Sequence, residues 1–145
     1  MFDKGKLVGF IIHAIDKRNG DYIAFNTGTG VVPEYRGTKI VQSIYEYAIP
    51  ELKKEGITKC VLEVITENHK AINAYQGVGF NICKHLKCYN GTISLKEHNP
   101  QIIDTTYQNM NWNTLPNQKL YSWDNQNKCL ENGNYNYYKT HIFEH

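Results

Sequence analysis

Glycine and basic residues separate an apolar run from a helix-forming stretch at residues 31–40 (VVPEYRGTKI). This pattern predicts that a strand ends, a turn follows and a helix begins. The first N–H groups of such a helix lack intrahelical acceptors, and with the helix dipole they form an anion site suited to a pyrophosphate. Gly37 would let the backbone approach the anion closely, and Arg36 adds positive charge. Taken alone, the segment also fits an ordinary turn before a surface helix.

Two predicted strands must position this segment. Residues 7–14 are β-branched, aromatic and apolar without a helical period, which predicts a strand buried on much of both faces. Asn19-Gly20 favours a hairpin turn, so the strand that starts at Tyr22 should run antiparallel to the first. Two glycines at positions 28 and 30 indicate a bulge in that strand, or close approach of a ligand.

The segments that follow alternate between helix and strand. From Thr38 to Lys54 apolar residues fall on one helical face, with Pro50 as a kink and Gly56 as the stop. We then expect a strand at residues 58–65, a helix from His69 to Gln76 and a strand from Phe80 to Tyr89. This order predicts an α/β domain with a right-handed crossover.

Two motifs, in the same order along the chain, resemble those of a known family. Residues 31–40 match part of the pattern Val-x-Pro-x-x-Arg-Gly-x-Gly-x-Gly, and the later segment matches Asn-x-x-Ala-x-x-x-Tyr-x-x-x-Gly-Phe in full. The residues of the second motif are Asn68, Ala71, Tyr75, Gly79 and Phe80. In these motifs, over roughly residues 5–90, the chain resembles the GNAT N-acetyltransferase superfamily. The resemblance implies a partial GNAT fold, a mixed sheet with two splayed parallel strands and flanking helices.

The same resemblance implies how acetyl-CoA would be held. The strand end at Val31 and Val32 would pair with the pantetheine, and Asn68 and Ala71 would lie along the pantetheine arm. The pyrophosphate would lie on the turn and the helix start, a set that comprises Arg36, Gly37, Thr38, Lys39, Ile40 and Val41. No metal is implied.

Tyr75 would lie near the CoA sulfur as the catalytic acid. A phenol has a reference pKa of about 10, so it is protonated at neutral pH and can donate a proton to the departing thiolate. In isolation the same residue also fits a core aromatic on a helix face. A base must take a proton from the amine, and Glu63 and His13 are candidates by residue type. Glu63 also fits a solvent-facing strand residue, and bound water is a third option.

The chain departs from the family pattern in two ways. Lys39 and Val41 replace the second and third motif glycines, which would weaken CoA binding or reshape the turn. A full domain of this kind begins with a strand, two helices and another strand, so we expect the chain to lack this front part. Leu7–Ala14 would then be an edge strand.

Charge, hydropathy and cysteine spacing argue against nucleic-acid binding, a membrane span and a zinc site. A formal net charge of +2 is too small to indicate nucleic-acid binding, and no apolar run approaches a membrane span. Cys83, His85 and Cys88 lie close together, but their spacing fits no zinc site. We read all four cysteines as reduced thiols in a cytoplasmic protein without a signal peptide.

The sequence changes character after Asn90. Residues 91–145 are rich in Asn, Tyr and Gln and predict an extension of the core domain 1–90, or part of a second unit. Its apolar anchors include Trp112, Leu115, Leu120 and Trp123, and these could cover the exposed edge. We expect a homodimer in which this tail takes part.

Two functions remain open at this level. The first is an N-acetyltransferase that moves acetyl from acetyl-CoA to a primary amine of a small molecule or a peptide. The second is a non-catalytic acyl-CoA-binding module, a truncated remnant of a larger acetyltransferase.

Overall fold

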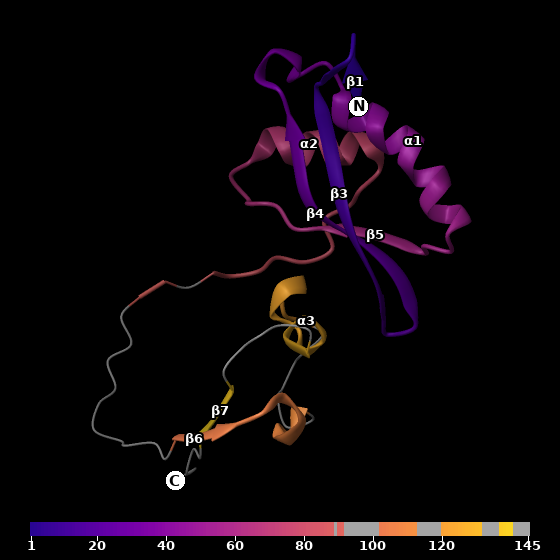
Figure 1. Ribbon diagram of the computed structural model, residues 1–145. Helices are drawn as coiled ribbons and strands as arrows, with labels where there is room; N and C mark the ends of the chain where they lie inside the picture. The colour runs from indigo at the N-terminus through magenta and orange to yellow at the C-terminus, as the bar shows by residue number, and fades with distance from the viewer. Residues whose placement is uncertain (89, 92–101, 113–119, 132–136, 141–145) are drawn as a thin grey trace. The chain divides into compact units, whose positions relative to one another are not determined.

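The computed structural model describes residues 1–88, 90–91, 102–112, 120–131 and 137–140 (Figure 1). The chain divides into two compact units, Met1–Cys83 and Lys84–His145. The division into domains at residue 90 remains a prediction, whereas the α/β class is confirmed.

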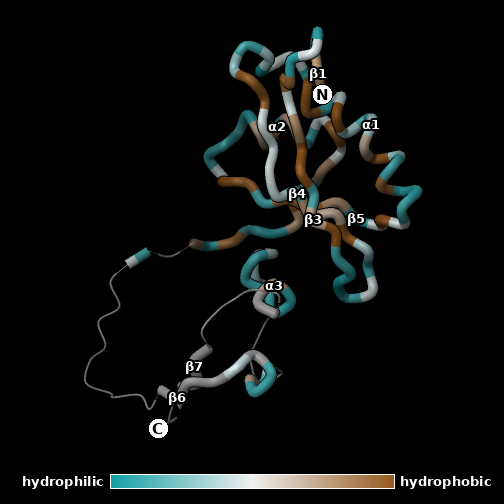
Figure 2. The backbone as a smooth tube through the Cα atoms, viewed as in Figure 1, coloured by the Kyte–Doolittle hydropathy of each residue, from teal (hydrophilic) through white to brown (hydrophobic). Residues whose placement is uncertain are grey.

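The first unit is built on a mixed sheet. Strand β3 (Gly9–Arg18) pairs antiparallel with β4 (Asp21–Val31), which pairs on its other side with the parallel β5 (Lys59–Leu62). A short hairpin of β1 (Phe2–Asp3) and β2 (Lys6–Leu7) precedes them. The hydropathy colouring of Figure 2 shows that β3 is largely hydrophobic and that the β3–β4 turn is hydrophilic.

The β3–β4 hairpin has the predicted turn and the predicted bulge. Asn19 and Gly20 adopt positive φ angles of 52° and 88°, which a tight hairpin turn requires. The register then shifts between Ile12 and His13, so Thr27 is the extra residue of β4. Such a bulge bends the strand and increases its twist.

Helices α1 (Ile40–Lys54) and α2 (His69–Val78) pack against one face of the sheet. The helix α1 continues through Pro50 to Lys54. The buried apolar residues of this unit are Val8, Ala24, Phe25, Ile40, Tyr45 and Ile57. Burying a valine, isoleucine or phenylalanine side chain stabilises a fold by roughly 1.5–3 kcal/mol, so the larger of these residues anchor the helices to the sheet.

The second unit contains a small antiparallel pair, β6 (Ile102–Thr105) with β7 (Tyr137–Thr140). Its described part also contains helix α3 (Asn127–Glu131) and 3-10 turns at Tyr107–Asn109 and Trp123–Asn125. Trp123 is buried and Leu120 is exposed, while Leu115 lies outside the described residues.

Three expectations about strands are corrected. The strand predicted from Phe80 to Tyr89 is absent from its described part, residues 80–88, which forms no ladder with another strand. A local apolar pattern cannot supply the partner that a strand needs. The strand predicted at residues 58–65 is shorter and ends at Leu62. The first strand is not buried on both faces, because Phe10 is 43% exposed and Ile12 is 56% exposed.

No helix in the described part of the chain is long and apolar enough to cross a membrane. Within those same residues, His, Cys, Asp and Glu side chains form no group that could hold a metal ion.

Candidate functional site

A cleft opens in the first unit where β5 ends. It has a volume of about 260 Å³. Its walls come from β4, from the first turn of α1, from the segment after β5, and from α2. The lining residues are Asn26, Thr27, Gly28, Thr29, Val41, Leu62, Glu63, Val64, Asn68, Ala71, Ala74 and Tyr75.

The cleft exists because two parallel strands stop pairing. The ladder between β4 and β5 runs from the Ile23–Lys59 pair to the Asn26–Leu62 pair and ends there. Strand β4 continues to Val31, so among the described residues no strand lies beside the edge of Thr27–Val31 that faces β5. This is the splayed pair that the resemblance implied.

The start of helix α2 explains the spacing of Asn68 and Ala71. The Asn68 side chain accepts a hydrogen bond from the Ala71 N–H at 3.2 Å and caps the helix. An N-cap side chain satisfies an N–H two or three residues into the helix, which sets the Asn-x-x-Ala spacing. Asn68 thus fixes where α2 begins beside the cleft.

The end of α2 explains the spacing of Tyr75, Gly79 and Phe80. Gly79 has a φ of 110°, its N–H donates to the Gln76 carbonyl (2.9 Å), and the Phe80 N–H donates to the Tyr75 carbonyl (3.1 Å). This is a Schellman motif, which favours glycine and brings together the side chains at its two ends. The rings of Tyr75 and Phe80 make that contact with centroids 5.9 Å apart.

The hydroxyl of Tyr75 meets polar groups of β4. Its O–H donates to Thr29 Oγ1 at 3.0 Å, and the Asn26 amide reaches the Tyr75 oxygen at 3.4 Å. The same amide donates to the hydroxyl of Tyr45, which is fully buried on α1. Burial raises the pKa of Tyr45 to about 12, so it stays neutral. Tyr75 is half-buried and lines the cleft, so it is the tyrosine that can reach a ligand.

The turn before α1 has two residues in the left-handed region. Gly37 has a φ of 80° and Lys39 a φ of 63°. Glycine adopts such angles freely, whereas a lysine is strained there. The family pattern has glycine where Lys39 stands, and the backbone angle gives the physical reason. The turn is also held by Thr38 Oγ1 to the Tyr35 carbonyl (2.6 Å) and Arg36 Nε to the Val31 carbonyl (3.1 Å).

The first turn of α1 carries no acidic side chain, and the exposed Arg36 and Lys39 precede it. The first hydrogen bond of the helix backbone runs from the Ser43 N–H to the Lys39 carbonyl. The N–H groups of Ile40–Gln42 therefore precede the first hydrogen bond within the helix. Val41 belongs to this turn and also lines the cleft. An anion at the helix end would therefore lie next to the cleft.

The structure gathers only part of the predicted set at the cleft. Val41, Asn68, Ala71 and Tyr75 line it, while Arg36, Gly37, Thr38 and Lys39 form the exposed turn beside it. Ile40 is buried in the core, and Val31 and Val32 are half-buried where β4 ends.

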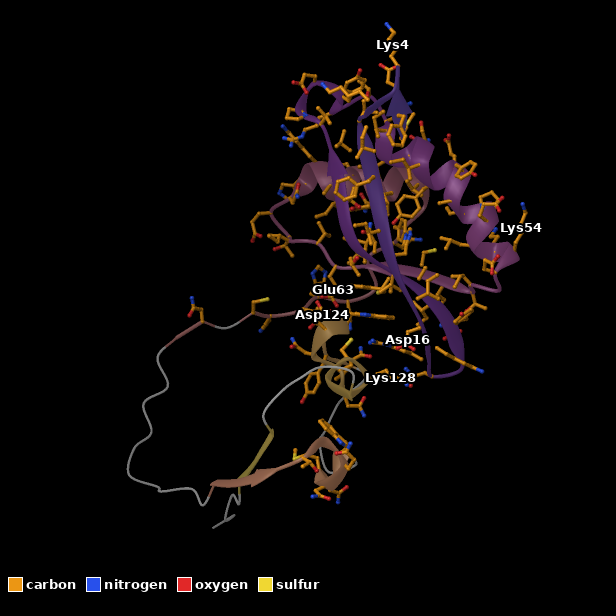
Figure 3. All side chains as sticks on the ribbon, viewed as in Figure 1. Lys4, Asp16, Lys54, Glu63, Asp124 and Lys128 are labelled. Atoms are coloured by element: carbon orange, nitrogen blue, oxygen red, sulfur yellow. The ribbon has the colours of Figure 1, made fainter. Side chains whose placement is uncertain are left out.

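The two candidate bases have different positions. Glu63 follows directly after β5 (Figure 3). Its side chain is exposed and lines the cleft. His13 is not among the lining residues; its ring packs edge-on against Tyr45 with centroids 5.7 Å apart. Burial lowers the pKa of His13, and its buried Nε2 has no hydrogen-bond partner among the described residues. The geometry favours Glu63.

Sequence reasoning missed the polar residues of β4. Asn26, Thr27 and Thr29 line the cleft, and none was expected to have a role of its own. The available signal was the pair of glycines at positions 28 and 30, which marked an irregular strand without showing which side chains it would turn inward.

The chain matches the acetyltransferase (GNAT) family over residues 1–80. It is similar to N-alpha-acetyltransferase 30 of Schizosaccharomyces pombe, with 30% identity over 98 residues that cover 62% of each chain. It is also similar to N-alpha-acetyltransferase 30 of Saccharomyces cerevisiae, with 36% identity over 55 residues that cover 38% of this chain and 31% of that protein. The chain thus spans less than two thirds of the length of these curated relatives.

Solved structures with a similar fold include aminoglycoside acetyltransferases. AAC(6')-Iy, in complex with a bisubstrate analog, aligns with a TM-score of 0.54 at 20% identity, covering 63% of this chain and 66% of that one. AAC(6')-IG from Acinetobacter haemolyticus aligns with a TM-score of 0.53 at 15% identity, covering 65% and 68%. These identities show the fold alone. The family match, which covers more than half of the chain, shows that the chain belongs to the acetyltransferase (GNAT) family.

Proposed function

We propose that the chain is an N-acetyltransferase that transfers the acetyl group of acetyl-CoA to a primary amine. The cleft carries the proposal, because it brings Tyr75, Glu63 and the first turn of α1 around one space. Family membership supports the reaction class. The competing function is an acyl-CoA-binding module without catalysis, which the substitutions Lys39 and Val41 would favour.

Acetyl-CoA fits the groups that this site offers. The helix-terminal N–H groups of α1 suit its pyrophosphate, and the unpaired β4 edge suits the amides of pantetheine. Two backbone groups expected to pair with pantetheine have partners already: the Val32 N–H donates to the Val8 carbonyl (3.0 Å), and the Val31 carbonyl accepts from Arg36 (3.1 Å). We therefore assign the strand-like pairing to Thr27–Gly30, apart from the Gly28 N–H, which donates to Asn26 Oδ1 (3.0 Å).

The roles of the two cleft residues follow from their chemistry. Glu63 takes a proton from the acceptor amine, directly or through water, as the nitrogen bonds to the acetyl carbon. The carbon–sulfur bond breaks with its electron pair on sulfur, and Tyr75 donates its phenolic proton there. Such proton transfers contribute typically about 10²–10⁴-fold each to a rate.

We propose the N-terminal amine of a polypeptide as the first acceptor to test. The proposal rests on the names of the two curated relatives, N-alpha-acetyltransferase 30 in both cases. An exposed carboxylate at the cleft, Glu63, would also attract a cationic amine.

Calorimetric titration with acetyl-CoA tests the binding half of this function. We expect saturable heat and a rise in Tm, since a ligand that binds only the folded state stabilises it. No heat and no Tm shift at millimolar acetyl-CoA would contradict both the enzyme and the binding module.

Replacing Lys39 with glycine separates two properties of the turn. Glycine relieves the positive φ, so we expect Lys39→Gly to raise the free energy of unfolding by up to about 1 kcal/mol. Affinity for acetyl-CoA should nevertheless fall, because a cation near the pyrophosphate is lost. Denaturant unfolding and calorimetry measure the two effects, and a gain in affinity would show that Lys39 only obstructs the site.

We further propose that the chain forms a homodimer through β3. This strand pairs with β4 on one side and has no strand on its other side in the described sheet, and Phe10 and Ile12 are exposed on it. Edges of this kind pair with a second copy, which an antiparallel two-fold interface closes. Light scattering should give a dimer for the native chain and a monomer for Ile12→Lys. A monomeric native chain would contradict the proposal.

We also propose a reducing compartment such as the cytoplasm. Cys60, Cys83 and Cys88 are free thiols in the structure, as such a compartment favours.

A further inference from the structure

The bulge in β4 brings two polar residues onto the same face. In a regular strand, residues three apart point to opposite faces of the sheet. Asn26 lies opposite His13 and Thr29 lies opposite Ile11, and Thr27 is the extra residue between these pairs. Because His13 and Ile11 are two apart on β3, they share a face, and so do Asn26 and Thr29. That face carries α1 and α2, since Asn26 bonds to Tyr45 and Tyr75.

The Asn26 amide is fixed on both of its polar atoms. Its oxygen accepts from the Gly28 N–H (3.0 Å), and a backbone N–H can only donate, so the amide orientation is determined. Its nitrogen therefore faces Thr29 Oγ1 (2.8 Å) and the Tyr45 hydroxyl (3.0 Å). Asn26 is 8% exposed and Tyr45 is fully buried, which prevents the amide from rotating toward solvent.

The Thr29 hydroxyl links this fixed amide to the cleft. It accepts the Tyr75 O–H (3.0 Å) and lies 3.2 Å from Asn26 Oδ1, to which it donates. A hydroxyl can rotate and exchange its donor and acceptor roles. The order of bonds is thus Tyr75 to Thr29 to Asn26.

We propose that Thr29 and Asn26 are positioning residues for Tyr75, with the Thr29 hydroxyl accepting from Tyr75 at rest and donating to it after proton transfer. The inference rests on the proposed function. The Tyr75 O–H first turns from Thr29 toward the sulfur. When this O–H bond breaks, the proton goes to the thiolate and the negative charge stays on the phenolic oxygen. The Thr29 O–H turns to donate to that oxygen, and the Asn26 N–H, 3.4 Å away, adds a second donor. A proton from solvent, equal to the one released by the amine, restores the phenol.

A double-mutant cycle on turnover tests whether Thr29 acts through Tyr75. Thr29→Val keeps the shape of the side chain but removes the hydroxyl. We expect kcat to fall roughly 10- to 100-fold, the scale of one hydrogen bond to a charged group, with KM for acetyl-CoA within about twofold. Thr29→Ser should restore most of kcat. In the Tyr75→Phe background, Thr29→Val should have no further effect on kcat.

The matched control is Thr58→Val, which removes an exposed hydroxyl bonded to the Tyr22 carbonyl just before β5 begins, at the opposite end of that strand from the cleft. It should turn over like the native chain. If Thr29→Val lowers kcat equally with and without the Tyr75 hydroxyl, or raises KM instead, Thr29 contacts the ligand and the proposal is wrong.

The same double-mutant cycle can be measured without ligand, with the free energy of unfolding as a readout that does not depend on activity. If the bond from Tyr75 to Thr29 exists, the loss of stability in the double variant should be smaller than the summed losses of the single variants. Additive losses of stability would contradict the polar relay, by which we mean the bonds from Tyr75 to Thr29 to Asn26, even in an active enzyme. A coupled cycle in a chain without turnover would instead show that the relay stands and that the proposed function fails.

Discussion

Replacing Tyr75 with phenylalanine is expected to lower kcat for acetyl transfer by roughly 10²-fold or more, the scale of general acid catalysis. The phenylalanine ring keeps the contacts with Tyr45 and Phe80, whose centroids lie 6.4 and 5.9 Å from that of Tyr75. The change therefore removes the proton donor and leaves the walls of the cleft in place. Steady-state kinetics with saturating acetyl-CoA measure the effect, and calorimetry should show acetyl-CoA affinity within about threefold of native, less than 1 kcal/mol.

Tyr47→Phe is the matched control for this prediction. Tyr47 is on α1, is 77% exposed and does not line the cleft. Its loss should leave kcat unchanged. Equal turnover in Tyr75→Phe and the native chain would remove Tyr75 from the mechanism and leave the cleft without an acid.

Filling the cleft from α2 is expected to abolish acetyl-CoA binding. Ala71 lines the cleft, so a phenylalanine at this position would occupy the space between α2 and the unpaired β4 edge. We expect Ala71→Phe to raise the Kd for acetyl-CoA by about 100-fold or more, which corresponds to roughly 2.7 kcal/mol. Calorimetry measures the loss, and the far-UV circular dichroism spectrum should remain native.

Asn73→Phe introduces the same ring on the same helix, at an exposed position that does not line the cleft. It should bind acetyl-CoA like the native chain. If Ala71→Phe binds as tightly as Asn73→Phe, acetyl-CoA does not enter between β4 and α2, and the site must be sought elsewhere.

Helix α2 could be predicted from the sequence because its signals are local. Asn68 caps its start by bonding to Ala71, and Gly79 ends it with a positive φ. Each interaction joins residues a few positions apart, so the spacing of residue types in the sequence is enough to predict it. The same holds for the Asn19-Gly20 turn between β3 and β4.

The polar relay could not be predicted, because it depends on contacts between distant segments. Asn26 and Thr29 share a face only because Thr27 is an extra residue, and the register with β3 decides where that residue falls. Their partners Tyr45 and Tyr75 come from two separate helices. The error at residues 80–88 has the same origin, since a strand requires a neighbour that the local pattern does not specify.

The position of Lys39 shows how a departure from a family pattern becomes interpretable once a backbone angle is known. From the letters alone, lysine in place of glycine implies only a change of charge and size. The φ of 63° shows that this residue must adopt the left-handed conformation, so the substitution also strains the turn. This strain is why the Lys39→Gly variant separates stability from affinity.

Transfer of an isotope-labelled acetyl group tests the central claim most directly. The chain is incubated with acetyl-CoA labelled in its acetyl carbon and with a peptide that has a free N-terminal amine and no lysine, and the peptide is analysed by mass spectrometry. We predict labelled peptide in amounts that scale with native chain, that fall with Tyr75→Phe and Ala71→Phe, and that vanish when the N-terminus is blocked. Saturable acetyl-CoA binding without label on this peptide or on any other primary amine offered would contradict an acetyltransferase and leave a binding module.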